Sequence, residues 1–352
     1  MNFGLMIGQI EKIGGMEKQA VLLARELKRR GIDVFLFVSG PRTSHDKIEL
    51  LNLLSVTRKH LYNTRYSKHL SKWLLRHYCT RNGISNLIAF NVENAEIAVS
   101  ARLEARIAMN VRGTRFTCDP VLASKYANIA SHCDFLITNS ENTSELLRQS
   151  NIRGKGNIRV IHNGIELPQV EPTPKSKMIL YVGSLKAIKD PMTFVTACHD
   201  AIKTDDEIRV TMVGEGNMRP LIEEYIRSNG LQRKFILTGE IPYEGIPYGE
   251  ASVFVNSSIR ESSSNSLLEA LSFGIPVVAT ANSGNSEILS HLNWHKLVPV
   301  SNTDEMAKAI HSLLNTGPDR RLAIFKESRE LIREHYSISK TVDGYIESFS
   351  SP

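Results

Sequence analysis

Residues 261–271 read ESSSNSLLEAL, and they lie between two short apolar runs at 253–256 and 277–279. The serines and the asparagine supply side-chain oxygens that cap a helix N-terminus, and the leucines after them mark the apolar face of a helix. We therefore expect a strand, a helix and a second strand in succession. In this pattern Glu261 stands before the helix begins, and Glu269 lies two turns inside it.

Short apolar runs alternate with helical patterns along the rest of the chain. The expected strands are Phe3 to Ile7, Val34 to Val38, Leu87 to Phe90, Ile107 to Val111, Phe135 to Thr138, Arg159 to His162, Met178 to Val182, Ile208 to Val213, Phe235 to Leu237, Val253 to Asn256, Val277 to Ala279 and Leu297 to Val300. After Asp304 the pattern is helical and ends near Phe349. This alternation predicts an α/β fold with mostly parallel sheets, covered on both faces.

The length of 352 residues corresponds to about two domains of roughly 150 residues each. The segment from Gln169 to Lys177 and the residues around it contain several prolines and few apolar side chains, which is typical of a linker. We place the domain boundary there, so that the first domain spans residues 1–168 and the second begins at residue 169.

The composition excludes several classes of protein. Hydrophobic residues make up 41% of the chain and charged residues 23%, which is typical of a folded protein and not of a disordered one. No apolar run approaches the ~18 residues of a spanning helix, and the start of the chain does not read as a signal peptide. The four cysteines form no CxxC pair and no cluster with histidine. We therefore expect no disulfide framework or zinc site, and a cytoplasmic location.

The net charge of +6 is concentrated locally. No acidic residue occurs between Glu49 and Glu93, whereas seven lysines and arginines fall there. An apolar stripe at helical spacing accompanies them; it comprises Leu70, Trp73, Leu74, His77 and Tyr78, flanked by Lys68, Lys72 and Arg76. The stretch from Arg58 to Arg81 is equally compatible with a helix that meets an anionic membrane surface and with a helix that packs into the first domain. No nucleic-acid-binding module accompanies the charge, so we expect no nucleic-acid partner.

Candidate ligand-binding residues follow the expected strands, because ligands of open parallel sheets bind beyond the carboxyl ends of the strands. Gly14 and Gly15 permit a close backbone approach to an anion, or simply form a tight turn. The loop at 183–190 offers lysines that could neutralise a diphosphate or remain solvated. Residues 213–219 begin like a dinucleotide fingerprint, but Arg219 stands at the third glycine position, which favours a compact glycine turn.

The stretch from Glu261 to Glu269 also has two interpretations. Free amides at the helix start suit a phosphate, and the two carboxylates can accept hydrogen bonds from sugar hydroxyls. Alternatively, the stretch is a capped surface helix with two ordinary glutamates. The neighbouring motifs favour the first interpretation.

Taken in order and spacing, these motifs resemble those of glycosyltransferase family 4, the retaining sugar-nucleotide transferases of the GT-B fold. The resemblance covers nearly the whole chain: Gly14-Gly15, residues 162–166, Gly183 to Lys189, residues 214–216, Gly239, Glu261 to Glu269, Gly284 to Glu287 and the closing helix. It implies two Rossmann-like, doubly wound α/β domains that face a cleft. It also implies that the second, nucleotide-sugar-binding domain ends at residue 335, and that residues 336–352 return to the first, acceptor-binding domain.

The resemblance also implies roles for individual residues. Gly14 and Gly15 lie under the donor diphosphate, Lys189 neutralises it, and Glu261 lies near the donor sugar. The amides of Ser264, Asn265, Ser266 and Leu267 contact sugar and phosphate, Glu269 holds the ribose hydroxyls, and the backbone around Ile241 faces the base. Ser184 and Gly214 complete the donor site. Glu261, Lys189 and Arg112 are the expected catalytic residues.

Two positions depart from the family pattern. Ser184 stands where the family usually has an arginine, so that a diphosphate contact is missing or is supplied by Lys186. Asn110 and Arg112 occupy a stretch where many members have a histidine or an aspartate, and we assign Arg112 to a phosphate or an anionic acceptor. The chain has no Asp-x-Asp motif, so we expect no metal and no other cofactor, with the leaving group stabilised by Lys189 and oriented amides.

The implied activity is transfer of a hexose from a nucleotide-diphosphate sugar, with UDP-sugars preferred over GDP-sugars. The implied acceptor is a glycan or a lipid-linked saccharide of cell-surface polysaccharide or lipopolysaccharide biosynthesis. Two alternatives are a nucleotide-sugar epimerase of the same fold and a sugar-nucleotide-binding protein with reduced catalysis. We expect a cytoplasmic protein, either free or peripheral on the inner face of the membrane.

Overall fold

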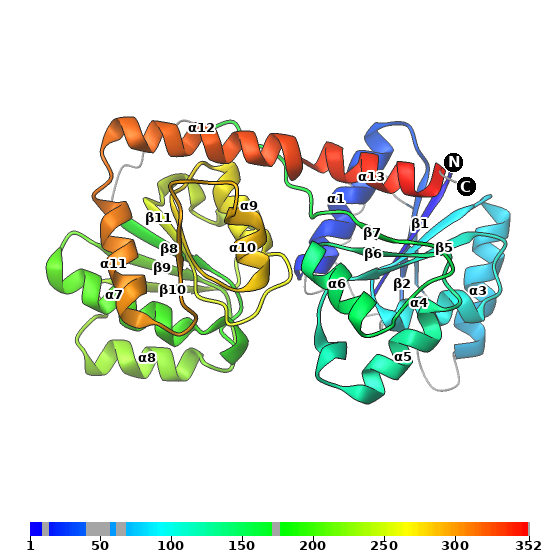
Figure 1. The fold of residues 1–352 in the computed structure, drawn as a ribbon, viewed down its shortest axis with the longest axis horizontal. Coiled ribbons are helices and arrows are strands. Elements are labelled where there is room, and N and C mark those ends of the chain that lie inside the picture. Colours follow the sequence, from blue (N-terminus) through cyan, green and yellow to red (C-terminus); the bar gives the residue numbers. More distant parts are fainter. Residues whose placement is uncertain (9–13, 40–56, 61–67, 171–176, 351–352) are drawn as a thin grey trace. The chain divides into compact units, whose positions relative to one another are not determined.

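The computed structural model describes residues 1–8, 14–39, 57–60, 68–170 and 177–350. The chain forms two compact units, coloured along the sequence in Figure 1: unit 1 comprises Met1–Gly164 and Ile338–Pro352, and unit 2 comprises Ile165–Ser337. Unit 1 therefore ends four residues before the expected boundary at residue 168. Most of the expected linker, residues 171–176, lies outside the described residues.

Unit 1 contains a seven-stranded parallel sheet in the order β3-β2-β1-β4-β5-β6-β7. Its strands are β1 (Phe3–Ile7), β2 (Val34–Val38), β3 (Thr57–His60), β4 (Asn86–Ala89), β5 (Arg106–Val111), β6 (Phe135–Thr138) and β7 (Ile158–Val160). Its helices are α1 (Gly15–Arg29), α3 (Lys68–Arg81), α4 (Val92–Ser100), η1 (Arg115–Thr117), α5 (Pro120–Ala130), α6 (Glu141–Gln149) and α13 (Ile338–Ser350).

Alternate side chains of the apolar strands supply the two apolar layers of this sheet, as the two-residue period of a strand requires. Phe3, Leu5 and Ile7 of β1 pack with residues of α1 and α13 on one face, whereas Met6 packs with residues of α3, α4 and α5 on the other. The returning helix α13 inserts Phe349 between the rings of Phe3 and Phe135, at centroid distances of 5.2 and 4.8 Å.

Unit 2 contains a six-stranded parallel sheet in the order β10-β9-β8-β11-β12-β13. Its strands are β8 (Met178–Val182), β9 (Arg209–Val213), β10 (Phe235–Gly239), β11 (Val253–Asn256), β12 (Val277–Thr280) and β13 (Lys296–Val298). Its helices are α7 (Pro191–Thr204), α8 (Arg219–Ser228), α9 (Asn265–Ser272), α10 (Ser283–Leu289), α11 (Thr303–Leu314) and α12 (Pro318–His335), with the single turns η2 (Ala187–Lys189), η3 (Tyr243–Gly245) and η4 (Tyr248–Glu250).

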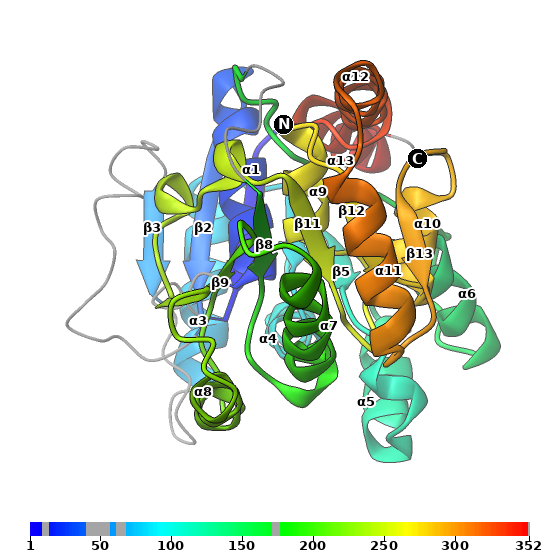
Figure 2. The ribbon, with the colours of Figure 1, turned by 90° about the vertical axis from the view of Figure 1, so that its left-hand side faces the viewer.

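Helices cover both faces of the second sheet as well. Helices α7, α8 and α11 pack on one face, with α7 and α11 side by side in Figure 2, and α9, α10 and α12 pack on the other. The expected α/β fold with two parallel sheets is therefore confirmed, and each expected strand is present to within two residues at either end.

Strand β3 was not expected. It reads Thr-Arg-Lys-His and lies at the edge of the first sheet, paired with β2. Edge strands often carry charged residues, because charge discourages pairing with another chain, and such strands lack the apolar run by which buried strands are recognised. The basic stretch from Arg58 to Arg81 thus begins with a strand and continues, beyond residues that are not described, into α3.

Candidate functional site

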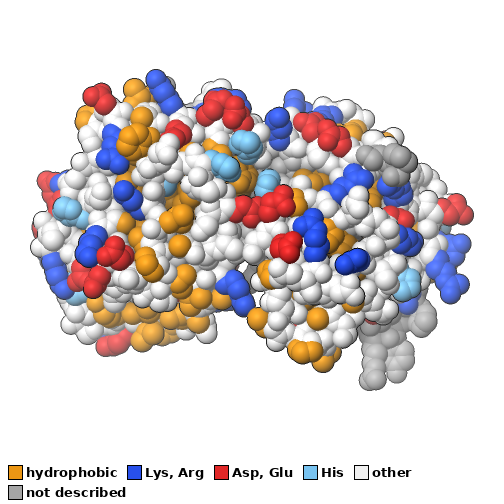
Figure 3. Space-filling view, in the orientation of Figure 1, with side chains coloured by type: hydrophobic (Ala, Val, Ile, Leu, Met, Phe, Trp, Pro, Cys, Tyr) orange, Lys and Arg blue, Asp and Glu red, His pale blue; other side chains and the backbone are white. Residues whose placement is uncertain are grey.

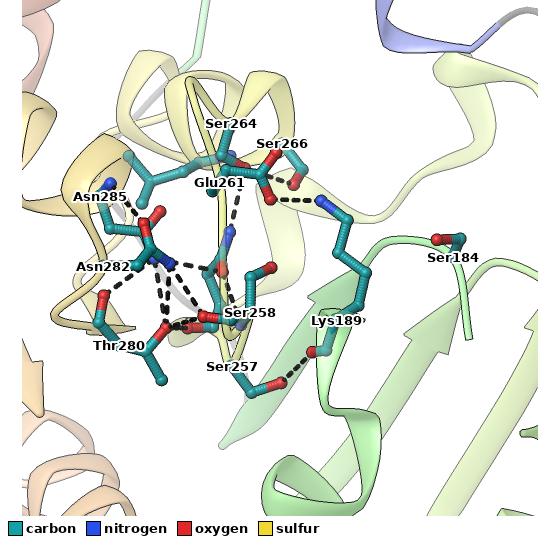
Figure 4. Close-up of polar contacts among 12 residues, drawn as sticks. Ser184, Lys189, Ser257, Ser258, Glu261, Ser264, Ser266, Thr280, Asn282 and Asn285 are labelled. Atoms are coloured by element: carbon teal, nitrogen blue, oxygen red, sulfur yellow. Dashed lines mark hydrogen bonds and ion pairs between the residues drawn. The ribbon is translucent and has the colours of Figure 1, made fainter. Parts of the chain in front are cut away.

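Lys189 and Glu261 meet at the point where the strand order of unit 2 reverses. The sheet runs outward from β8 in one direction and from β11 in the other, and the loops after these two strands carry Lys189 and Glu261. Lys189 Nζ donates to Glu261 Oε2 in an ion pair (Figure 4). The side chains are 26% and 14% exposed, respectively. A partly exposed charge pair at this edge is available to a polar or charged ligand.

Hydrogen bonds to backbone carbonyls hold the same two loops together. Ser257 Oγ donates to the carbonyl of Lys189 at 2.9 Å, and the amide of Ile259 donates to the carbonyl of Ile188 at 2.9 Å. Asp190 follows in the left-handed region at φ 44° and accepts a 2.8 Å hydrogen bond from the hydroxyl of Thr193 in the first turn of α7. The main chain at Lys189 is therefore held by the loop after β11 and by the first turn of α7.

The serine run beside Glu261 caps α9. Ser264 Oγ accepts a 3.4 Å hydrogen bond from the amide of Leu267, and it receives a 3.0 Å bond from Asn256 Nδ2. Ser266 Oγ lies 3.3 Å from the same oxygen. The expected cap is present, and it already engages the Leu267 amide. Asn265 is the first residue of α9, and the hydroxyl of Ser263 is buried without a partner among the described residues.

Glu269 is the fifth residue of α9, so it lies little more than one turn inside the helix and not two. Ser264 is the cap, so the helix begins at Asn265, nearer to Glu269 than expected. The carboxylate of Glu269 accepts a 2.6 Å hydrogen bond from Tyr248 Oη. Burial and the charge of Glu269 raise the pKa of Tyr248 well above its ordinary value, so the phenol stays protonated as the donor. Ile241 packs against the same apolar cluster as Tyr248.

The glycines of unit 2 bring three loops into close backbone contact. Gly214 has φ 136°, and a Cβ atom there would lie 2.0 Å from the carbonyl oxygen of Gly183. Its amide donates to the carbonyl of Gly239 at 2.9 Å. Ser184 follows on the adjoining loop, apart from the ion pair of Lys189 (Figure 4). Arg219, at the third position of the fingerprint, pairs with Glu215 and Glu223.

In unit 1, Gly14 and Gly15 are exposed at the start of α1, and the side chain of Glu17 folds back over them. A Cβ atom on Gly14 would lie 2.8 Å from Glu17 Oε2. Burial raises the pKa of Glu17, and hydrogen bonds from the amides of Glu17 and Gly14, together with the charge of Arg112, act in the opposite direction. The amide of Gly14 therefore already has the carboxyl group of Glu17 as a partner within its own turn.

Asn110 lies near the end of β5 and Arg112 directly follows that strand, and the two side chains have different surroundings. Arg112 Nη1 donates to Asn163 Oδ1 at 2.8 Å, and its guanidinium carbon lies 5.2 Å from the ring centroid of Phe90. Asn110 is buried, and its Nδ2 donates to Tyr345 Oη of α13 at 2.6 Å. Asn110 is thus committed to holding the returning helix, whereas Arg112 is half-buried.

The stripe on α3 divides between two environments. Leu74 and Tyr78 pack against the apolar core of unit 1, whereas Trp73 is 60% exposed and stacks on His77 at a centroid distance of 5.4 Å. Lys72 and Arg76 lie on the same helix. Among the described helices, none combines the length and apolarity needed to cross a bilayer. On the face shown in Figure 3, basic and acidic side chains are interspersed over both units.

Two family models match the chain in succession. The model described as Glycosyltransferase Family 4 matches residues 13–169, and the model described as Glycosyl transferases group 1 matches residues 165–331. Together they span most of the sequence and both units. The chain belongs to glycosyltransferase family 4.

Full-length relatives agree with this membership. An uncharacterized glycosyltransferase of Haemophilus influenzae is 23% identical over 97% of this chain and 98% of that protein. The lipopolysaccharide core biosynthesis glycosyltransferase LpsE of Rhizobium meliloti is 20% identical over 97% of each. Six further curated relatives match over less than half of their own length. Among solved structures, HepE of Anabaena in complex with UDP-glucose covers 100% of each chain at 16% identity and a TM-score of 0.84, which identifies the GT-B fold.

Several residues that contact Glu269 or lie beside the loop of Glu261 in this glycosyltransferase were not expected from the sequence. They are Tyr248, which bonds Glu269, and Thr280, Asn282 and Asn285, which lie beside the loop that carries Glu261 (Figure 4). The signal for Asn282 and Asn285 in the sequence was the motif from Gly284 to Glu287, which contains Asn285 and begins two residues after Asn282. Within the described ranges, no three histidine, cysteine or acidic side chains are grouped as metal ligands would be.

Proposed function

We propose that this glycosyltransferase transfers a hexose from a UDP-sugar to a glycan or lipid-linked acceptor, with retention of configuration at the anomeric carbon. The observation that carries the proposal is the ion pair of Lys189 and Glu261 at the strand-order reversal of unit 2. The complex of HepE with UDP-glucose supports the choice of donor, and the role of LpsE in lipopolysaccharide core biosynthesis supports the class of acceptor.

Unit 2 supplies the groups that we assign to the donor. The ammonium of Lys189 has three N–H donors, so it can bind a diphosphate oxygen while it keeps its contact with Glu261. Glu269 accepts from the ribose hydroxyls, and the backbone at Ile241 faces the base. The hydroxyl of Ser263, buried without a described partner, and the amides at the start of α9 are assigned to sugar and phosphate, with Ser184 and Gly214 alongside.

In the proposed reaction, the bond between the anomeric carbon and the diphosphate oxygen breaks, and the acceptor oxygen bonds to the same face of the sugar. Lys189 and oriented amides stabilise the negative charge that develops on the leaving diphosphate, whereas Glu261 stabilises the positive charge that develops on the sugar. The diphosphate takes the proton of the acceptor hydroxyl. We assign Gly14, Gly15 and Arg112 of unit 1 to phosphate and acceptor.

We also propose that the enzyme works at the cytoplasmic face of a membrane that carries anionic lipid. The exposed Trp73 and the neighbouring Lys72 and Arg76 of α3 suit a headgroup region, where aromatic rings and basic side chains are both favoured. Cys79, Cys133 and Cys198 are free and buried, which suits a reducing compartment.

The test is incubation of the protein with UDP-glucose and other UDP-sugars, with and without saccharide and lipid-linked acceptors. Acceptor-dependent release of UDP, with the donor's anomeric configuration kept in the product's proton NMR spectrum, is the expected result. Donor isomerisation without acceptor would instead identify an epimerase, and binding without turnover a protein with reduced catalysis. We expect activity to persist in EDTA, and loss of activity that added metal restores would refute metal independence.

A further inference from the structure

The loop that carries Glu261 has contacts on a second side, opposite those with Lys189. Residues 257–264 connect β11 to α9 without regular secondary structure of their own. Residues 280–284, which end β12, form the turn to α10 and begin that helix, lie against this loop in Figure 4. Because an irregular loop is held only by its contacts, this turn contributes to the position of Glu261.

Two side chains of the turn converge on one carbonyl of the loop. The oxygen of Ser258 accepts from Thr280 Oγ1 at 2.5 Å and from Asn282 Nδ2 at 2.9 Å. Thr280 and Asn282 are both buried, so both bonds are shielded from competing water. The amide of Ser258 is engaged as well, because it donates to Asn256 Oδ1 at 3.1 Å.

The backbone of the same turn contacts Glu261 directly. The amide of Gly284 donates to the carbonyl of Glu261 at 3.1 Å. A Cβ atom on Gly284 would lie 2.6 Å from that carbonyl oxygen, so the approach requires a residue without a side chain. The carboxylate and the main chain of Glu261 are thus held by different elements: Lys189 holds the first and the turn at 280–284 holds the second.

Asn282 has two separable functions in this arrangement. Its Oδ1 caps α10 by accepting from the amide of Asn285 at 3.0 Å, and its Nδ2 donates to Ser258. We propose that Asn282 is a positioning residue for catalysis, which acts through Ser258 to keep the carboxylate of Glu261 at the reacting sugar. This inference rests on the proposed function, and it adds a residue that touches neither donor nor acceptor.

The variant Asn282→Asp separates the two functions. Aspartate caps a helix as well as asparagine does, but it replaces the donor to Ser258 with a second acceptor. We expect kcat to fall about tenfold to a hundredfold, the scale of a small misplacement of a catalytic group, while the donor KM stays within about threefold. Asn302→Asp is the matched control, because Asn302 Oδ1 caps α11 through the amide of Glu305 at 3.0 Å.

A second pair of variants, at Thr280, tests the inference if the Asn282→Asp protein does not fold. Thr280→Val keeps the shape of the side chain but removes the other donor to Ser258, and Thr280→Ser keeps that donor. We expect Thr280→Val to lower kcat and Thr280→Ser to restore most of it. A fall in kcat that is equal for both variants, or equal for Asn282→Asp and Asn302→Asp, would overturn the inference.

Amide hydrogen exchange tests the tether independently of activity. In the whole protein, Asn282→Asp should accelerate exchange in residues 257–264 about fivefold or more, the effect of losing one net hydrogen bond, and Asn302→Asp should not. Unchanged exchange in that segment would overturn the inference even if the wild-type protein transfers sugar. A wild-type protein that transfers no sugar would refute the proposed function, and the catalytic role of Asn282 with it, whatever the exchange data show.

Discussion

Tyr248 Oη donates a 2.6 Å hydrogen bond to Glu269 Oε2, and the two residues are 1% and 4% exposed, respectively. The ring of Tyr248 also stacks on Phe273 at a centroid distance of 5.2 Å. Tyr248 belongs to η4 and Glu269 to α9, so the bond joins two separate segments of unit 2. The carboxylate that we assign to the ribose is therefore oriented by a residue that shares an apolar cluster with Ile241, which we assign to the base.

We predict that Tyr248 and Glu269 are energetically coupled. Tyr248→Phe keeps the stacked ring but leaves a buried carboxylate with one partner fewer, which should lower the free energy of unfolding by about 1–3 kcal/mol. Urea denaturation of Tyr248→Phe, Glu269→Gln and the double variant measures the coupling. If the loss of unfolding free energy in the double variant equals the sum of the losses in the two single variants, the hydrogen bond contributes nothing to stability.

The second prediction concerns donor affinity. Glu269→Gln keeps the size of the side chain but removes the charge that strengthens contacts to ribose hydroxyls, so UDP binding should weaken by about 1.5–3 kcal/mol. Isothermal titration of UDP is the measurement. Glu305→Gln, on the exposed face of α11, is the control and should leave the affinity unchanged. Equal affinities in all three proteins would remove Glu269 from the donor site.

The third prediction concerns turnover. Glu261→Gln removes a charge that is most valuable when positive charge develops at the anomeric carbon, so kcat should fall by about tenfold or more while the donor KM changes little. Steady-state kinetics with the preferred UDP-sugar provides the measurement, with the exposed Glu250→Gln as the control. A raised KM at unchanged kcat would instead make Glu261 a donor-binding residue.

The fourth prediction concerns pH and His295. Burial lowers the pKa of His295 to about 3, and its Nδ1 accepts from the amide of Val277 at 3.0 Å. Below pH ~6.5 the unfolded chain takes up this proton and the folded chain does not. The contribution of neutral His295 to the free energy of unfolding is therefore fully present above pH ~6.5, and it is lost progressively as the pH falls towards 3.

The variant His295→Asn keeps an acceptor for Val277 without the titration. Its stability deficit against the wild type, measured by urea denaturation, should shrink between pH 7.5 and pH 4.5. His132→Asn, at an exposed position, is the control. A deficit for His295→Asn that is constant over the range would contradict the expected titration.

The fifth prediction concerns the membrane. The protein should co-sediment with anionic vesicles and detach as salt rises, because at physiological ionic strength electrostatic attraction reaches only ~8 Å. Replacing Lys68, Lys72 and Arg76 with glutamine should weaken sedimentation without a change in the free energy of unfolding. The control replaces Lys203 and Lys308 of unit 2 with glutamine, and it should leave sedimentation unchanged. Equal sedimentation with neutral and anionic vesicles would eliminate the electrostatic mechanism.

The sequence predicts the two sheets because buried parallel strands are short, apolar and separated by helical patterns. It does not predict β3, whose four residues are all polar or basic. The motif from Glu261 to Glu269 is recognisable together with the neighbouring motifs, whereas Tyr248 and Asn282 are not. Tyr248 contacts its partner 21 residues away and Asn282 contacts Ser258 24 residues away, and no local pattern encodes such pairs.

Helix α13 imposes an order on the synthesis of the protein. It supplies Val342, Tyr345 and Phe349 to the core of unit 1, yet it is translated after all of unit 2. At roughly 5–20 residues per second, a ribosome takes on the order of 10–35 s to pass from the end of β7 to α13. During that time the rings of Phe3 and Phe135 lack their neighbour Phe349. A ribosome that stalls within unit 2 therefore leaves a nascent chain whose first sheet lacks one of the two helices, α1 and α13, that cover this apolar face.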